Sequence, residues 1–311
     1  MSLANLTLPK GMKSPLSGKG PFSGRELAKI EGLAFSLPCQ DPWIGTDGTP
    51  GHAYLEAAAN AWLENPEWMT FLDDDSPAYD LKRAEYDLYR HYWREPLKHA
   101  EHILDVGCGV GRFAVPLVEE GRTLYGVDAD IKSLQSCAWS VAGMRGKLDL
   151  YWTTATKLPD IGLVDAAIAA EVLCYVPNAE AAVQAIVEKL KPGAPFMISV
   201  EAEYGWATAE DAPPGGIYAA LTGNTLDIPG ERWVRAFSRD QLHNLLTSAG
   251  LIVDEIIATN YVLDGPLERC APESMALSEL LSFEESARKH PVFGPLNRLW
   301  MAWAHKPESP A

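Results

Sequence analysis

The first clear pattern along the chain is a helical spacing of apolar residues before residue 100. Apolar side chains recur at intervals of three and four residues in segments 52–72 and 77–99, which is the period of a helix with one buried face. Residues 1–24 are instead rich in Pro, Gly, Ser and Lys and carry little apolar side chain to bury. The pattern predicts a flexible leader over 1–24 and an N-terminal helical cap over 25–99.

Beyond residue 100, short apolar runs alternate with amphipathic segments. The runs at 102–107, 123–128, 148–154, 165–171 and 195–203 read as strands, and the segments at 112–121, 131–143 and 179–193 read as helices. Strands that alternate with helices in this way form a parallel sheet with helices on both faces. The sequence therefore predicts an α/β domain over residues 100–311.

Composition narrows the class of protein. The chain has 311 residues, of which 47% are hydrophobic, enough for a substantial buried core. No run approaches the ~18 apolar residues that span a bilayer, and the N-terminus lacks the apolar middle of a secretory signal. The five cysteines are scattered without a CxxC pair, so neither a metal site nor a disulfide framework is predicted. We expect a soluble, cytoplasmic protein with no membrane partner.

The net charge excludes one large class of partner. At pH 7 the formal net charge is −16, whereas binding to a phosphate backbone draws most of its affinity from Lys and Arg contacts. Nucleic acid is therefore not expected as a partner. The sequence is compatible with a homo-oligomer but does not specify one.

Candidate chemistry begins with the stretch HILDVGCGVGRF at residues 102–113. Gly107, Gly109 and Gly111 follow a predicted strand, and such loops let a ligand approach backbone N–H groups closely. Asp128 ends the next predicted strand, where a carboxylate can accept both hydroxyls of a ribose. The dinucleotide pattern GxGxxG would need glycine where Arg112 stands, which disfavours a nicotinamide enzyme.

The order of these motifs resembles a known family. The segments ILDVGCGVGRF, LYGVDAD, ATKLPD, DAAIAAEVLCYVPN and VEKLKPGAPFMISVEAE are similar to those of class I S-adenosylmethionine-dependent methyltransferases, in particular their small-molecule branch. The resemblance covers 103–201 and continues through 233–258 and 298–307. It implies a Rossmann-like, doubly wound, mostly parallel seven-stranded sheet with helices on both faces.

The same resemblance implies a site for S-adenosylmethionine at the ends of the strands. The glycine loop would hold the methionine end, Asp128 the ribose and Ala129 the adenine. Relatives often place an acid after the third strand, but here Thr154 and Ala155 stand there, so a hydroxyl or backbone group would meet the adenine. The implied cofactor-binding residues are Asp105, Gly107, Cys108, Gly109, Gly111, Asp128, Ala129, Thr154, Ala155, Glu171 and Val172.

A sulfonium methyl group is already activated, so placing a nucleophile behind it in a dry site does most of the work. A base is needed where the acceptor must lose a proton. The catalytic candidates are Glu171, Tyr175, which stands where relatives often have His, and His91; Glu201 and Glu203 are further options. The alternatives are a solvated or cofactor-bound carboxylate for Glu171, and a surface residue on an amphipathic helix for His91.

Aromatic residues concentrate outside the predicted cofactor core. A long segment after the strand at 195–203 predicts a lid insertion over 202–236, because long loops at a ligand-binding edge usually carry function. Its aromatic residues would wall an apolar acceptor pocket, or alternatively form a core of their own. The substrate-binding candidates are Tyr175, Glu201, Tyr204, Trp206, Tyr218 and Trp233.

Absent motifs narrow the reaction. The chain has no [DNS]PP[YFW] after the predicted fourth strand and no cluster of Asp there, which disfavours amide or base-amino methylation and metal-dependent catechol methylation. We therefore expect methyl transfer to an oxygen or nitrogen of a small molecule, such as a biosynthetic or natural-product intermediate. The alternatives are a catalytically silent S-adenosylmethionine-binding regulator or partner protein, another transfer from the same cofactor, and a nicotinamide enzyme.

Overall fold

The computed structural model describes a large part of the chain. The described residues are 33–36, 79–129, 133–134, 137–138, 141, 144–176, 178–208, 216–222, 225–226, 234–263, 265–268 and 276–308. The predicted leader at 1–24 and the predicted helix at 52–72 lie outside them. Among the described residues, no helix is long and apolar enough to cross a membrane.

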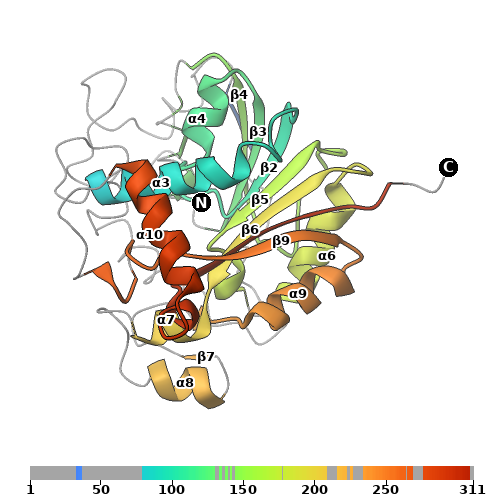
Figure 1. The fold of residues 1–311 in the computed structure, drawn as a ribbon. Helices are drawn as coiled ribbons and strands as arrows, with labels where there is room; N and C mark the ends of the chain where they lie inside the picture. The colour runs from blue at the N-terminus through green and yellow to red at the C-terminus, as the bar shows by residue number, and fades with distance from the viewer. Residues whose placement is uncertain are drawn as a thin grey trace.

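A twisted sheet of eight strands forms the centre of the molecule (Figure 1), in the order β1-β4-β3-β2-β5-β6-β10-β9. Neighbouring strands are parallel except that β10 runs antiparallel to β6 and β9. The strands are β1 (Leu33–Ser36), β2 (His102–Val106), β3 (Thr123–Asp128), β4 (Lys147–Trp152), β5 (Ala166–Ala170), β6 (Pro195–Glu201), β9 (Ile252–Thr259) and β10 (Leu299–His305).

Seven of these strands, β2 to β6 with β9 and β10, confirm the predicted Rossmann-like, mostly parallel sheet. Strand β1 adds an eighth at the edge, parallel to β4, in the region that was predicted to be helical. Its four residues, Leu33–Ser36, are too few to show a period of two in the sequence. They form a strand because β4 offers an unpaired edge.

Helices cover both faces of the sheet and bury two apolar cores. On one face α3 (Tyr79–Trp93) and α4 (Ala114–Glu119) pack on β2, β3 and β4. On the other, α6 (Ala179–Lys189) and α9 (Arg239–Ser248) pack on β5 and β6. Helix α10 (Leu277–Lys289) lies beside α3, where Leu88 and Leu280 are in one cluster. The described residues also include two single turns of 3₁₀ helix, η3 (Leu173–Tyr175) and η5 (Gly294–Leu296).

The predicted lid region carries short elements of its own. They are α7 (Glu203–Thr208), α8 (Gly216–Thr222) and the antiparallel pair β7 (Thr225–Leu226) and β8 (Val234–Arg235). Helix α9 then begins at a capping box, in which the Ser238 hydroxyl accepts from Gln241 N and the Gln241 side chain accepts from Ser238 N. This cap fixes the point where the chain leaves the lid region and returns to the sheet.

The parallel register brings the loops of interest to one edge of the sheet. Val106 pairs with Val127 at the ends of β2 and β3, and Ala170 pairs with Ser199 near the ends of β5 and β6. Consequently the segments 107–111, 171–176 and 202–208 all leave the sheet at its carboxyl edge. This is the edge at which α/β sheets bind ligands.

Candidate active site

The glycine loop after β2 depends on left-handed backbone. Gly107, Gly109 and Gly111 have φ values of 71°, 54° and 103°, which residues other than glycine rarely adopt. A Cβ at Gly107 would overlap Cγ2 of Val172, whereas the nearest atom to a Cβ at Gly109 is the Gly107 carbonyl oxygen at 4.0 Å. The loop is therefore tight at Gly107 and open beside Gly109, where a ligand has room.

Asp128, at the end of β3, ties the loop to the neighbouring strand. Its Oδ2 accepts a hydrogen bond of 2.8 Å from the Gly109 backbone N–H. Gly107 N and Cys108 N also donate to the carbonyl of Val127, at 2.6 and 3.1 Å. The predicted ribose-binding carboxylate is thus held against the loop that was predicted to hold the methionine end of the cofactor.

Asp105 supplies a buried acid directly below this loop. The side chain is almost fully buried, and its Oδ2 has no hydrogen-bond partner among the described residues. Burial raises the pKa of the Asp105 carboxyl to about 7, with the Arg112 guanidinium opposing this shift and the Asp128 carboxylate adding to it. An unpaired buried oxygen of this kind fits a donor or cation on a bound ligand.

The raised pKa of Asp105 predicts how the stability of the protein depends on pH. The unfolded carboxyl titrates near 3.8 and the folded one near 7, so between these pH values the folded state keeps a proton that the unfolded state has lost. We expect the free energy of unfolding to fall as pH rises through this window, by up to roughly 4 kcal/mol from this group. Urea unfolding at several pH values measures the fall, and Asp105→Asn is expected to flatten it. An equally steep fall in that variant would contradict the assignment.

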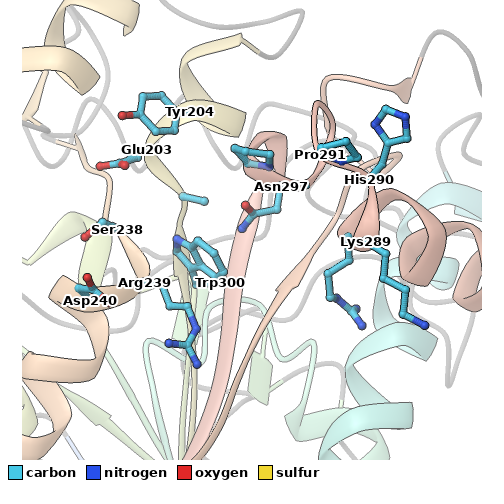
Figure 2. Close-up of a pocket in the computed structure, with 14 residues that line it drawn as sticks. Glu203, Tyr204, Ser238, Arg239, Asp240, Lys289, His290, Pro291, Asn297 and Trp300 are labelled. Atoms are coloured by element: carbon cyan, nitrogen blue, oxygen red, sulfur yellow. The ribbon is translucent and has the colours of Figure 1, made fainter.

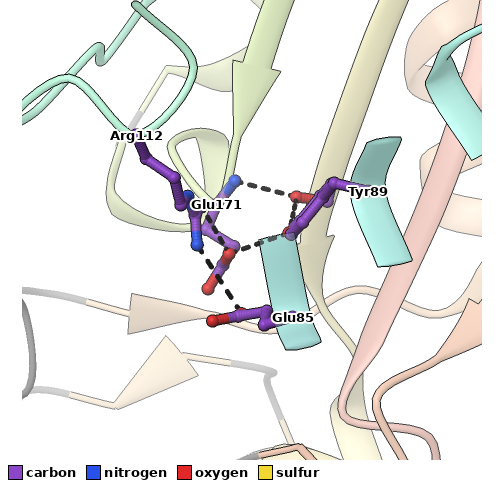
Figure 3. Close-up of polar contacts among 5 residues, drawn as sticks. Glu85, Tyr89, Arg112 and Glu171 are labelled. Atoms are coloured by element: carbon purple, nitrogen blue, oxygen red, sulfur yellow. Dashed lines mark hydrogen bonds and ion pairs between the residues drawn. The ribbon is translucent and has the colours of Figure 1, made fainter. Parts of the chain in front are cut away.

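Glu171 follows β5 and is the centre of a polar network (Figure 3). Its carboxylate accepts hydrogen bonds from the Tyr89 hydroxyl and from Arg112 Nη2, both at 2.8 Å. Its backbone N–H donates to the carbonyl oxygen and the Oγ of Ser199, at 2.9 and 3.0 Å. Glu171 has a φ of 55°, which is a left-handed backbone conformation. This conformation is strained in residues other than glycine, and it persists here because these contacts hold it.

Arg112 is the cation that balances this network. Its guanidinium lies over the rings of Tyr89 and Phe113, at 5.1 and 5.2 Å from their centroids, and pairs with Glu85 at 3.6 Å as well as with Glu171. Burial lowers the pKa of Arg112, but the carboxylates of Glu171 and Glu85 raise it by more than burial lowers it. The guanidinium therefore stays charged. Burial and the Glu171 carboxylate raise the pKa of Tyr89 well above its usual value, so its hydroxyl remains a donor.

The other predicted cofactor residues lie close to the same edge. Ala129 follows β3, and its carbonyl accepts from Trp152 Nε1 at 2.8 Å. Thr154 Oγ1 lies 3.1 Å from Thr156 Oγ1, and Ala155 is buried. Cys108 is buried, and its hydrogen bond with Cys137 together with burial raises the pKa of its thiol well above the usual value.

The structure separates the predicted catalytic and substrate residues into two sets. Tyr175 is half-buried in η3 beside Glu171, and Glu201 forms a buried ion pair with Arg298 at the end of β6. His91 is exposed on α3, edge-on to Tyr92 and two residues from Tyr89, so it points away from the face that reaches Glu171.

Two of the lid candidates are exposed on the short helices that follow β6. Tyr204 and Tyr218 are 38% and 73% exposed, on α7 and α8. Trp206 belongs to α7, and Trp233 lies outside the described residues.

Four members of the network were not predicted from the sequence: Glu85, Tyr89, Arg112 and Ser199. A signal for two of them was present, since Glu85 and Tyr89 are four residues apart in a predicted helix and therefore share one face. In the sequence, Arg112 is noticeable only because it stands where the GxGxxG pattern would have glycine. Ser199 lies inside an apolar strand and gave no signal.

The chain is similar to known methyltransferases over more than half of its length. Residues 78–256 match the family model of a methyltransferase domain. The ubiquinone biosynthesis O-methyltransferase of Rickettsia typhi is 28% identical over 147 residues, which is 40% of this chain and 60% of that protein. That of Rickettsia prowazekii is 30% identical over 148 residues, or 40% of this chain and 58% of that protein. This chain thus spans about 60% of the length of these relatives.

Two solved structures share the fold. Magnesium protoporphyrin IX methyltransferase from Synechocystis PCC 6803, with bound SAH, is 14% identical with a TM-score of 0.53, covering 82% of this chain and 97% of its own. A methyltransferase from Methanosarcina mazei is 16% identical with a TM-score of 0.50, covering 70% and 98%.

Proposed function

The chain belongs to the methyltransferase-domain family, and on that premise we propose that it transfers a methyl group from S-adenosylmethionine to a small molecule. Its sheet has the class I, Rossmann-like arrangement of methyltransferases that act with this cofactor. The observation that carries the proposal is the pairing of Asp128 with an open, left-handed glycine loop at the carboxyl edge. Its location in the cytoplasm stays a prediction.

The residues at this edge fit the cofactor. We propose that the unpaired oxygen of Asp105 and the backbone of Gly107 to Gly111 receive the methionine end, and that Asp128 receives the ribose hydroxyls. Asp105 supports this because a buried carboxyl oxygen with no hydrogen-bond partner among the described residues suits an ammonium group. The open space beside Gly109 supports close approach of the ligand to the backbone. Bound there, the cofactor supplies an electrophilic methyl group.

Oxygen is the acceptor atom that the relatives favour. Both Rickettsia proteins are named O-methyltransferases, and we propose a hydroxyl of a small biosynthetic intermediate as the acceptor of this chain, with nitrogen as the second candidate. Such a hydroxyl must lose its proton as the methyl group is transferred. A phenol loses that proton more readily than an aliphatic alcohol does, so a phenol places the smallest demand on the protein.

The geometry supports a positioning role for Glu171. Its carboxylate already accepts hydrogen bonds from Arg112 and Tyr89. Before this carboxylate could act as a base, both donors would have to move away, or they would have to stabilise the protonated acid. In the proposed mechanism Glu171 fixes the loop after β5, and with it Val172 against Gly107. Tyr175, on the same loop, is the remaining candidate for contact with the acceptor. Catalysis then rests mainly on proximity and the exclusion of water.

The same engagement of Glu171 favours a second function, a cofactor-binding protein without turnover. Both functions require the cofactor, so its binding tests what they share. We expect Asp128→Ala to weaken binding of S-adenosylhomocysteine by about 1 to 3 kcal/mol, because a charged acceptor for two hydroxyls is lost. Isothermal titration calorimetry measures the change.

Asp160→Ala is the matched control for this substitution. Asp160 is fully exposed and 3.7 Å from Lys189, so its loss is expected to leave affinity within about twofold. Equal affinities for the Asp128 and Asp160 variants would show that the cofactor does not bind at the end of β3.

A further inference from the structure

Tyr89 of α3 and Ser199 of β6 close a ring of hydrogen bonds that begins and ends on Glu171 (Figure 3). The Glu171 backbone N–H donates to Ser199 Oγ at 3.0 Å, and this oxygen lies 2.7 Å from the Tyr89 hydroxyl oxygen. The Tyr89 hydroxyl donates to Glu171 Oε1 at 2.8 Å. Tyr89 and Ser199 are both fully buried. The ring therefore joins α3 and β6 to the first residue after β5.

The protons of this ring have a single arrangement. The Tyr89 hydroxyl has one proton, which it donates to the Glu171 carboxylate, because an ionised carboxylate only accepts. The Ser199 hydroxyl must therefore donate to the Tyr89 oxygen, while Ser199 Oγ accepts from the Glu171 N–H. Each hydroxyl is both a donor and an acceptor, and hydrogen bonds in such a chain strengthen one another. Removing either hydroxyl thus weakens the whole ring.

The ring holds the strained backbone of Glu171. This residue has a φ of 55°, and the ring fixes its backbone N–H and its carboxylate together. The Tyr89 hydroxyl is itself held in place, since the Tyr89 ring packs at 4.7 Å from that of Trp93 and at 5.3 Å from that of Phe113, between centroids. Helix α3 thus acts on the loop after β5 through one fixed hydroxyl.

Val172 carries this constraint to the glycine loop. A Cβ at Gly107 would overlap Val172 Cγ2, so the Val172 side chain occupies the space where other residues have their Cβ. The backbone of Glu171 determines where Val172 lies, because the two residues are adjacent. The Gly107 N–H in turn donates to the Val127 carbonyl at 2.6 Å, at the end of β3. A continuous series of contacts therefore leads from Tyr89 to the glycine loop.

We propose that Tyr89 is a positioning residue for cofactor binding. Its hydroxyl holds the left-handed turn at Glu171, and through Val172 this turn keeps the glycine loop in the shape that receives S-adenosylmethionine. The inference rests on the proposed function, since it names the residue that prepares the proposed cofactor site. Binding sites depend in this way on the groups that lock the contacting residues in place. Loss of the Tyr89 hydroxyl is therefore expected to weaken cofactor binding without removing a contact to the cofactor.

Tyr261 offers a matched buried hydroxyl in another part of the molecule. It is fully buried, and its hydroxyl donates to the Gly294 carbonyl at 2.8 Å. Gly294 lines an open pocket of about 520 Å³ between α7, the start of α9, the end of α10 and the start of β10 (Figure 2). No residue of the Glu171 network lines this pocket. Tyr261→Phe therefore removes a buried hydrogen bond and leaves the ring intact.

Isothermal titration calorimetry with S-adenosylhomocysteine tests the proposal on the full chain. We expect Tyr89→Phe to weaken binding about tenfold and Tyr261→Phe to leave it within about twofold, although both variants lose a buried hydrogen bond. If Tyr89→Phe does not fold, Ser199→Ala opens the same ring and is expected to give the same loss of affinity. Wild-type affinity in a variant with an opened ring, or an equal loss in Tyr261→Phe, would overturn the proposal.

Two substitutions of Glu171 separate positioning from direct contact with the cofactor. Glu171→Ala and Glu171→Gly both remove the carboxylate, but glycine adopts a φ near 55° without strain and alanine does not. We expect the glycine variant to bind S-adenosylhomocysteine at least about threefold more tightly than the alanine variant. Equal affinities would show that the turn at Glu171 does not control cofactor binding, which would overturn the proposal.

Hydrogen exchange in the free protein separates this inference from the proposed function. The amides of Gly107, Cys108 and Gly109 bond to the end of β3, so they exchange slowly while the loop is held. We expect them to exchange at least about tenfold faster in Tyr89→Phe than in the wild type or in Tyr261→Phe. Faster exchange, with no binding of S-adenosylhomocysteine by the wild type, would support the hold of Tyr89 on the loop and overturn methyl transfer. Unchanged exchange, with normal binding by the wild type, would overturn the role of Tyr89 alone.

Discussion

Replacing Arg112 by Met is expected to destabilise the protein by about 3 to 5 kcal/mol. The variant keeps most of the aliphatic stem but leaves Glu85 and Glu171 without their cation, and both lie in or near the buried network. Removing one partner of a largely buried ion pair costs this much because the carboxylates that remain are poorly solvated and lose a close opposite charge. Contacts of the guanidinium with Tyr89 and Phe113 are lost as well. Urea unfolding measures the change.

Neutral partners are expected to restore part of this stability. In the triple variant Arg112→Met, Glu85→Gln, Glu171→Gln the two carboxylates that face position 112 are neutralised together with the guanidinium, so we expect it to be more stable than Arg112→Met alone. Lys98→Met is the surface control, since Lys98 pairs with Glu95 where both are exposed, and should stay within about 0.5 kcal/mol of the parent. A loss below about 1 kcal/mol in Arg112→Met, or no recovery in the triple variant, would contradict the network.

Gly109→Val is expected to abolish cofactor binding, with a loss of affinity of at least about a hundredfold. The space beside Gly109 is open, and the proposed ligand lies against the backbone there, so a branched side chain takes its place. The same substitution strains the backbone, because Gly109 has a φ of 54°, at a cost of about 1 to 2 kcal/mol. Titration with S-adenosylhomocysteine measures affinity, and urea unfolding measures strain.

Gly162→Val separates strain from the blocked site. Gly162 has a φ of 74°, and a Cβ at this position would have no other atom within 4 Å. The residue lies in the loop that leads into the amino end of β5. We expect this variant to lose a similar amount of stability and to bind the cofactor normally. Unchanged affinity in Gly109→Val, or an equal loss in both variants, would move the cofactor away from the glycine loop.

The order of the sheet follows from features that act over short distances in the sequence. Alternating apolar runs and amphipathic segments predict a parallel sheet, and the position of the glycine loop after a strand predicts the edge at which ligands bind. The hydrogen bond of Gly109 with Asp128 joins the ends of adjacent strands, while their binding of the cofactor stays a prediction. Local patterns were sufficient for these parts.

The polar network could not be predicted in the same way, because it joins distant segments. Tyr89 and Glu171 are 82 positions apart, and Tyr89 and Ser199 are 110 apart. Nothing in a single sequence pairs them, and the left-handed backbone of Glu171 is imposed by these contacts rather than by its residue type. The role expected for Glu171 therefore changes from a base to a positioning residue in the proposed mechanism.

Asn297 illustrates a second limit. In the sequence it is one polar residue between a 3₁₀ turn and a strand, which is typical of an exposed loop. Its burial and its unpaired oxygen arise only when α7 and β10 meet. Burial that depends on such a meeting becomes visible in the structure alone.

Transfer of a labelled methyl group tests the central claim most directly. The protein is incubated with S-adenosylmethionine that carries a trideuteromethyl group, together with a panel of phenols and arylamines, and products are analysed by mass spectrometry. We predict a product in which one hydrogen of the acceptor is replaced by a trideuteromethyl group. The product is expected to form in equal amount to S-adenosylhomocysteine and to be absent with Gly109→Val. Binding of the cofactor with no labelled product from any acceptor in the panel would contradict methyl transfer to a small aromatic acceptor and favour a silent cofactor-binding protein.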